Sequence, residues 1–129
     1  MRSSARGVVA AHASLAAALV AAVEAITGRA GLLVAVSNDG LSGRDVQEAI
    51  ARALDDTGAT VVFTDLPAGS CALAARRLLR ERAGLSVVTG VNLPMLLEFA
   101  LRDDDPAEAL SAAVLRGREH IQHLPSDVG

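Results

Sequence analysis

A histidine and an aspartate, each placed directly after an apolar run, are the residues best suited to chemistry in this sequence. His12 follows the run Gly7–Ala11, and Asp65 follows the run Thr60–Thr64. A carboxylate that accepts a hydrogen bond from one imidazole nitrogen fixes the ring tautomer and leaves the other nitrogen free as a nucleophile. If the chain brings these side chains together, we expect His12 to be the nucleophile and Asp65 its orienting group.

The residues Ala68, Gly69 and Ser70 lie shortly after Asp65 and open a predicted helix. The first N–H groups of a helix have no partner within it and bind anions. Gly69 lets the backbone approach a bound group closely, and Ser70 supplies a hydroxyl donor. A nucleophilic histidine beside such an anion site indicates phosphoryl transfer through phosphohistidine. Taken singly, a histidine after a strand and an aspartate before a helix are also typical of structural residues, so that alternative stays open.

Two other groups of polar residues have the composition of metal ligands. His120 and His123 are three residues apart on a predicted helix, but the sequence shows no third ligand for them, and zinc sites use at least three protein ligands. Asp103, Asp104 and Asp105 precede a predicted helix, where negative charge is stabilising. We interpret these groups as a solvated helix face and a helix start, and no metal site is predicted.

Composition excludes several classes of function. The 129 residues are 51% hydrophobic and carry a net charge of −3, with two phenylalanines as the only aromatic residues. This charge does not favour a nucleic-acid partner, the absence of lysine excludes Schiff-base and P-loop lysine chemistry, and the lack of stacking aromatics disfavours a flavin. We expect no cofactor. Arg76, Arg77 and Arg80 are interpreted as a solvated helix face, with a docking site for an acidic partner as the alternative.

Cysteine usage and the early part of the chain indicate a cytoplasmic protein. Cys71 is the single cysteine, so we expect a reducing compartment. We interpret it as a small buried residue rather than as a thiol activated at a helix start. Arg2 and Arg6 ahead of an apolar stretch imitate a secretory signal, but His12 and Glu24 interrupt that stretch.

The elements that must position these residues alternate between apolar runs and helical patterns. Short valine-rich runs are typical of parallel strands buried on both faces, and they lie at Gly7–Ala11, Leu32–Val36, Thr60–Thr64 and Leu85–Thr89. Helices are predicted at Ser14–Ile26, Ser42–Leu54, Ser70–Arg82, Asn92–Leu101 and from Asp105 onward. The first helix has the predicted inner stripe Leu15, Leu19, Val23 and Ile26. The last helix has the stripe Leu110, Val114, Gly117, Ile121 and Leu124.

This order predicts an α/β fold in one domain, residues 1–129. The expected core is a doubly wound, mainly parallel sheet of about four strands in the order 2-1-3-4, with helices on both faces. Strands one and three are then neighbours, and a crevice opens at their carboxyl ends. His12 and Asp65 would face each other there. The polar segments Ser37–Gly40 and Gly90–Asn92 end at the same edge.

One segment carries a resemblance to a known family. The run Val87-Val88-Thr89-Gly90-Val91-Asn92-Leu93-Pro94-Met95-Leu96-Leu97-Glu98 resembles the G-V-N-L-P-M-L-x-E signature of the mannose-family EIIA domains of the bacterial phosphoenolpyruvate:sugar phosphotransferase system (PTS). His12 and Asp65 fall at the matching places. The resemblance extends from about Gly7 to Gly117.

The resemblance implies a parallel sheet in 2-1-3-4 order and a homodimer. It also implies that His12 accepts a phosphoryl group from phospho-HPr and passes it to an EIIB domain for sugar uptake. By position, Asp65 orients the ring, while Ser70 and the backbone at Ala68 and Gly69 border the phosphoryl group. The membrane is then involved only through the permease subunits.

The sequence departs from the family pattern at three places. Ala13 stands where the family usually has glycine after the histidine. Ala68 and Cys71 replace the first glycine and the proline of a Gly-Gly-Ser/Thr-Pro run. These changes leave the predicted nucleophile and its orienting acid in place. They motivate an alternative function, a regulatory PTS-like module that signals by its phosphorylation state without feeding a sugar permease.

Overall fold

A four-stranded parallel sheet forms the centre of the protein. The computed structural model describes residues 5–129. Its strands are β1 (Gly7–Ala11), β2 (Leu33–Ser37), β3 (Val61–Thr64) and β4 (Ser86–Val88). They pair in the order β2-β1-β3-β4, and every pair is parallel. The predicted topology is therefore confirmed, and no strand boundary differs by more than one residue from the predicted one.

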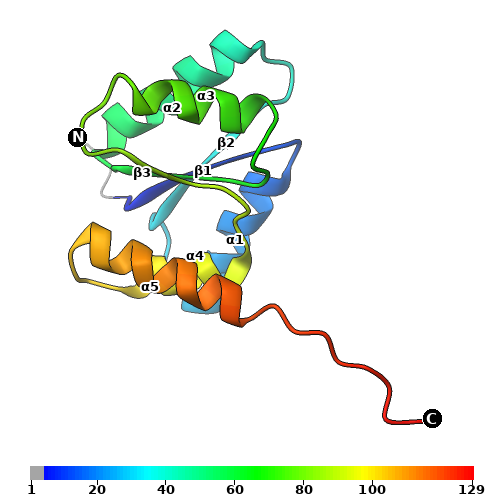
Figure 1. Cartoon of the computed structure of the whole chain (residues 1–129). Helices are drawn as coiled ribbons and strands as arrows, with labels where there is room; N and C mark the ends of the chain where they lie inside the picture. Colours follow the sequence, from blue (N-terminus) through cyan, green and yellow to red (C-terminus); the bar gives the residue numbers. More distant parts are fainter. Residues whose placement is uncertain (1–4) are drawn as a thin grey trace.

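Helices cover both faces of this sheet (Figure 1). They are α1 (Leu15–Thr27), α2 (Gly43–Thr57), α3 (Ser70–Leu79), α4 (Leu93–Leu101) and α5 (Pro106–Glu119). The α2 and α3 helices pack on one face, and α1, α4 and α5 lie on the other. None of the helices within residues 5–129 is both long and apolar enough to cross a membrane.

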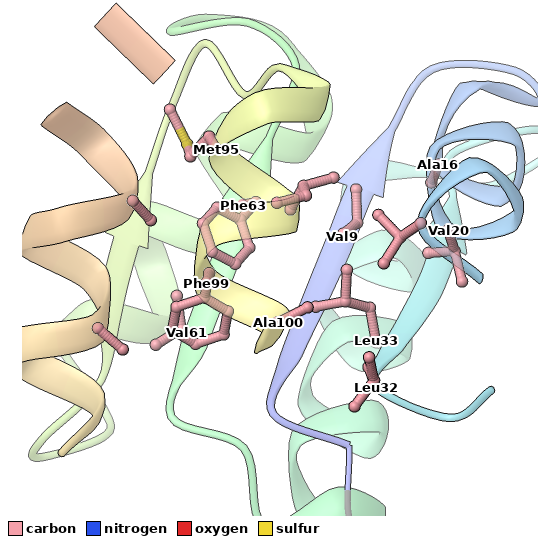
Figure 2. Close-up of a cluster of buried hydrophobic side chains, with 14 of the residues drawn as sticks. Val9, Ala16, Val20, Leu32, Leu33, Val61, Phe63, Met95, Phe99 and Ala100 are labelled. Atoms are coloured by element: carbon pink, nitrogen blue, oxygen red, sulfur yellow. The ribbon is translucent and has the colours of Figure 1, made fainter. Parts of the chain in front are cut away.

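The buried strand β1 contributes to two separate cores because alternate side chains point to opposite faces of a sheet. Val8 and Ala10 pack under α2 and α3, whereas Val9 and Ala11 pack under α1 and α4. On the second side, Phe63 and Phe99 meet edge to face with ring centroids 5.1 Å apart (Figure 2). Full burial of one such side chain stabilises the fold by about 1.5–3 kcal/mol. This packing holds β1 and β3 side by side, and His12 and Asp65 directly follow these two strands.

The segment Asn92–Glu98 includes the start of α4 and packs this helix against α5. The Asn92 side chain caps α4 by accepting from the Met95 N–H at 3.1 Å, and its Nδ2 donates to the Gly117 carbonyl at 2.9 Å. A Cβ on Gly117 would lie 3.0 Å from Asn92 Oδ1 and 3.1 Å from Met95 Cβ, so glycine fits this close approach of the two helices. Glu98 pairs with Arg116 of α5 at 3.2 Å. The signature segment thus has a packing role in this structure.

Two predicted helix stripes are only partly right. The buried residues of α5 are Ala109, Ala113 and Gly117, and the helix ends at Glu119, which leaves Ile121 and Leu124 in solvent. In α1 the predicted Val23 is buried and Leu19 packs against the core, but Ala16 and Val20 are buried in place of Leu15 and Ile26. In both helices small side chains face inward, because they let the helix approach its neighbours closely.

Candidate functional site

The structure brings His12 and Asp65 together at the carboxyl edge of the sheet. His12 follows β1 and Asp65 follows the neighbouring strand β3. The ring Nδ1 lies 2.8 Å from Asp65 Oδ2, and the backbone N–H of His12 donates to the same oxygen at 3.1 Å. The other carboxylate oxygen accepts from the Leu66 N–H at 3.0 Å. Three N–H donors therefore converge on one carboxylate.

This arrangement keeps Asp65 ionised and exposes one nitrogen of the ring. Burial acts to raise the pKa of Asp65, but the backbone N–H of His12, its ring and its charge together lower that pKa below its usual value of 3.8. The side chain of Asp65 is 11% exposed and that of His12 is 41% exposed. An ionised acceptor at Nδ1 favours the tautomer with the proton on that nitrogen. The lone pair is then on Nε2, on the accessible side of the ring.

Gly69 lies against that nitrogen. Its φ is +101° and its ψ is −179°, a conformation that essentially only glycine adopts. A Cβ built there would lie 3.3 Å from His12 Cε1 and 3.5 Å from Nε2. Gly69 is the N-cap of α3, and no side chain caps that helix. The first N–H groups of α3 are thus left for an anion beside Nε2. Ala68 is exposed and Ser70 is half-buried at this helix start.

Asn38 is a residue of this edge that the sequence analysis did not select. It follows β2 directly. Its Oδ1 accepts from the Ala13 N–H at 3.2 Å, and its Nδ2 donates to Ser70 Oγ at 3.1 Å. Asn38 therefore connects the residue after His12 with the start of α3. The signal in the sequence that could have identified Asn38 was its place in the polar segment Ser37–Gly40, which ends at the same edge as His12 and Asp65.

Ala13 adopts a left-handed backbone conformation, with a φ of +52°, and is the one non-glycine residue in 5–129 with a positive φ. Its carbonyl accepts from Ser37 Oγ at 2.7 Å. The left-handed region is unfavourable for residues with a Cβ. Glycine has no Cβ and adopts this conformation without strain, so it would suit the position after His12.

Ala13→Gly is therefore expected to stabilise the protein by about 0.5–1 kcal/mol. Removing left-handed strain gains about 1–2 kcal/mol, and the added freedom of glycine in the unfolded chain offsets about 0.5–1 kcal/mol. Urea unfolding measures the difference. Ala17→Gly, at an exposed helical position of α1, is the matched control and should lose about 1 kcal/mol. Equal losses in both variants would contradict the assignment of strain to Ala13.

The remaining candidate residues lie away from the His12 ring or have a local role. His120 and His123 are exposed at and beyond the end of α5, and residues 5–129 contain no cluster of three or more metal-ligating side chains. Asp105 caps α5 by accepting from the Ala107 N–H at 3.2 Å. Asp104 pairs with Arg102 at 2.7 Å.

Cys71 lies in the first turn of α3, and Arg76, Arg77 and Arg80 follow farther along that helix. Cys71 is fully buried, and burial, followed by the charge of Asp65, raises the pKa of its thiol. The thiol is therefore neutral at pH 7, as expected for a small buried residue. Arg76, Arg77 and Arg80 are exposed, and Arg76 also donates to the Pro67 carbonyl at 2.9 Å. That bond holds the loop between β3 and α3.

Comparison with known proteins identifies relatives. Residues 7–115 match the family model EIIA-man, described as "PTS system fructose IIA component". The "PTS system mannose-specific EIIAB component" of Escherichia coli K12 is 39% identical over 74 residues, which cover 55% of this chain and 23% of that protein. The chain thus spans about a quarter of the length of this relative.

Solved structures share the fold. A PTS component EIIA from Streptococcus agalactiae superimposes with a TM-score of 0.81 at 23% identity, covering 92% of this chain and 95% of the other. A mannose/sorbose specific IIA subunit from Enterococcus faecalis gives a TM-score of 0.79 at 20% identity, covering 98% and 97%. At these identities the likeness concerns the fold alone.

Proposed function

The chain belongs to the EIIA-man family of PTS components, and from this premise we propose that it is a phosphocarrier that accepts a phosphoryl group from phospho-HPr on His12 and passes it to an EIIB domain. The observation that carries the proposal is the contact of Asp65 with Nδ1 while Nε2 faces Gly69. The cycle needs no cofactor. We place it in the cytoplasm, with sugar uptake performed by membrane permease subunits.

The geometry supports a simple transfer step. Nε2 of His12 attacks the phosphorus of phosphohistidine in the donor, the donor N–P bond breaks, and a new bond forms between Nε2 and phosphorus. The proton on Nδ1 stays in its hydrogen bond to Asp65. The ring gains positive charge in this step, and the carboxylate stabilises that charge. In this proposal the N–H groups at the start of α3 and the Ser70 hydroxyl bind the phosphoryl oxygens, which the absence of a side-chain cap on α3 supports.

The surface around the site suits a protein donor. Leu66 and Leu73 are about half exposed, at 52% and 51%, although both are large apolar residues next to the site. A groove of about 290 Å³ lies beside them, lined in part by Pro67, Gly69 and Arg76. Exposed apolar residues that gather around an accessible nucleophile favour docking of another protein over capture of a small free phosphate.

The test is phosphoryl labelling with phosphoenolpyruvate, enzyme I and HPr. We expect one acid-labile phosphoryl group per chain, its loss in His12→Ala, and its retention in His120→Ala and His123→Ala, which are matched histidine controls. Labelled protein mixed with a mannose-type EIIB should then lose its label to that domain. A wild-type chain without label, or with full label in His12→Ala, would refute the proposal. Labelling without transfer to EIIB would support the regulatory alternative.

We also propose that the protein is a homodimer. Residues 120–129 extend away from α5 (Figure 1), and they carry Ile121, Leu124 and Val128 at 75–85% exposure. The strand β4 at the sheet edge pairs with β3 alone and is only partly buried. Ile121 lines a groove together with Val87 and Val88 of β4. Exposed apolar residues and an unpaired strand edge favour association with a second copy. Sedimentation velocity should give a dimer for the full chain and a monomer after truncation at Glu119. A monomeric full chain at micromolar concentration would contradict this proposal.

A further inference from the structure

We propose that Asn38 is a positioning residue of the phosphoryl site, acting on both sides of His12. Its side chain holds the Ser70 hydroxyl at the start of α3 and the backbone of Ala13 after β1. The inference rests on the proposed function and adds to it a residue outside the pair His12 and Asp65. It concerns how the site is held in shape before a phosphoryl group arrives.

The orientation of the Asn38 amide follows from its neighbours. A backbone N–H can only donate, so the group within 3.2 Å of the Ala13 nitrogen must be the amide oxygen. The NH₂ group therefore faces Ser70 Oγ, at 3.1 Å. Asn38 is half-buried and follows β2 directly. One side chain thus connects the loops after β1 and β2 with the first turn of α3.

The contact with Asn38 determines whether the Ser70 hydroxyl remains available to other groups as a donor or as an acceptor. The hydroxyl has one proton to donate and two lone pairs that accept. Because the Asn38 NH₂ donates to the oxygen, one lone pair is occupied and the Ser70 proton points away from Asn38. Ser70 is next to Gly69, whose Cβ position lies 3.5 Å from His12 Nε2. The contact with Asn38 thus leaves the Ser70 proton for another acceptor, and in our proposal that acceptor is an anion bound at the start of α3.

At Ala13 the same amide helps to hold a strained backbone. Asn38 accepts from the Ala13 N–H, and Ser37 donates to the Ala13 carbonyl at 2.7 Å. Both polar groups of the left-handed residue are thereby bound by the segment after β2. Ala13 directly follows His12, so these bonds fix the direction in which the chain leaves the nucleophile. Strained residues persist where the surrounding structure holds them in this way.

The first experiment uses Asn38→Asp, which keeps the size of the side chain and an acceptor for the Ala13 N–H. The carboxylate removes the donor to Ser70, accepts the Ser70 proton instead and places a negative charge beside the phosphoryl site. We expect the maximal rate of labelling by phospho-HPr to fall about 10-fold or more. The KM for phospho-HPr should change less than about 2-fold, because a positioning residue does not touch the donor protein. Asp39→Ala, an exposed neighbour in the same loop, should leave both constants unchanged.

The second experiment is a double-mutant cycle with Ser70→Ala. The cycle uses Asn38→Ala, which removes the donor to Ser70 without adding a charge. If Asn38 acts through the Ser70 hydroxyl, then Asn38→Ala should reduce the rate much less in the Ser70→Ala background than in the wild type. Equal fold-losses in the two backgrounds would overturn the proposed route through Ser70. An Asn38→Asp variant with wild-type rate would overturn the positioning role while leaving the proposed function intact.

A third measurement separates the inference from the proposed function. Amide ¹H–¹⁵N spectra of Asn38→Ala should show a large shift of the Ala13 N–H, since its acceptor is lost, and a shift at Ser70. Long-range ring ¹H–¹⁵N spectra should show a shift in the His12 ring. Asp39→Ala should shift none of the three. Unchanged Ala13 and Ser70 signals would refute the positioning role even if the wild-type chain is labelled. Shifted signals in a chain that takes no label would refute the function and retain the arrangement around Asn38.

Discussion

Asp65→Asn is expected to slow phosphoryl uptake about 10³-fold. The carboxylate receives three N–H groups, two from His12 at Oδ2 and one from Leu66 at Oδ1. An asparagine has one oxygen and one NH₂ group, so one of these positions must place a donor against a donor. With the NH₂ towards His12, the ring is driven to the tautomer with its proton on Nε2, which blocks the nucleophile. With the oxygen towards His12, the contact to Leu66 is lost and the charge that stabilises the phosphorylated ring is absent. Replacing an orienting aspartate in a comparable His–Asp pair lowers turnover by about 10⁴.

Rapid-quench labelling by phospho-HPr measures this effect. Circular dichroism should show an unchanged fold, since Asp65 lies at the sheet edge. Asp104 pairs with Arg102 after the end of α4 and has no contact with His12. Asp104→Asn is therefore a suitable control for the loss of one carboxylate. Uptake by Asp65→Asn within about threefold of the wild type would contradict the assigned role of the carboxylate.

The same carboxylate gives the stability a pH dependence of known sign. The pKa of Asp65 is lower in the folded protein than its usual value of 3.8. Its contribution to stability is therefore present above about pH 4 and is lost as the pH falls through the lower, folded-state pKa. In urea unfolding, the Asp65→Asn variant should not show the part of the acid-induced decrease in unfolding free energy that comes from Asp65. The stability difference between wild type and variant should accordingly shrink between pH 7 and pH 3.

Gly69→Ala is expected to reduce phosphoryl uptake about 10²-fold or more. The added methyl would lie 3.5 Å from Nε2, within the space that a phosphoryl group bound to that nitrogen must occupy. The backbone conformation at Gly69 is also one that a residue with a Cβ hardly adopts, which costs about 1–3 kcal/mol of stability. The loss of rate therefore has a steric part at the site and a conformational part in the fold.

A matched glycine separates these two parts. Gly58 has a φ of +74° at the end of α2, and a Cβ there would meet nothing within 4 Å. Gly58→Ala should destabilise the protein by about 1 kcal/mol and leave uptake unchanged. If Gly69→Ala kept wild-type uptake while losing stability like Gly58→Ala, Gly69 would have a purely structural role.

The sequence was sufficient to predict the topology and the meeting of His12 with Asp65, because both depend on strand order. Parallel strands end at one edge, and β1 and β3 are neighbours, so the residues after them must lie close together. Neither inference requires knowledge of side-chain rotamers. The role of Asn38 depends on which loop atoms its amide reaches, and no pattern of residue types specifies that.

The helix faces were predicted less well, for a physical reason. Hydrophobicity alone selects Leu15 and Ile26 for the inner face of α1, but these residues are 43% and 60% exposed. Alanine has little apolar surface, yet it permits the shortest distance between helix and sheet, and the close approach buries more of the surrounding surface. The sequence shows which residues are small. It does not show which of these small residues face a neighbouring element that can approach closely.

The double attachment of His12 to Asp65 Oδ2 has a consequence for the order of events in transfer. The backbone N–H and the ring Nδ1 are held by one oxygen atom, so the ring cannot turn from one partner towards another without breaking its contact to the carboxylate. Donor and acceptor must then approach Nε2 from the same direction, and each excludes the other. A surplus of the donor protein in its unphosphorylated form is accordingly expected to compete with the acceptor for the same surface and to inhibit delivery to it.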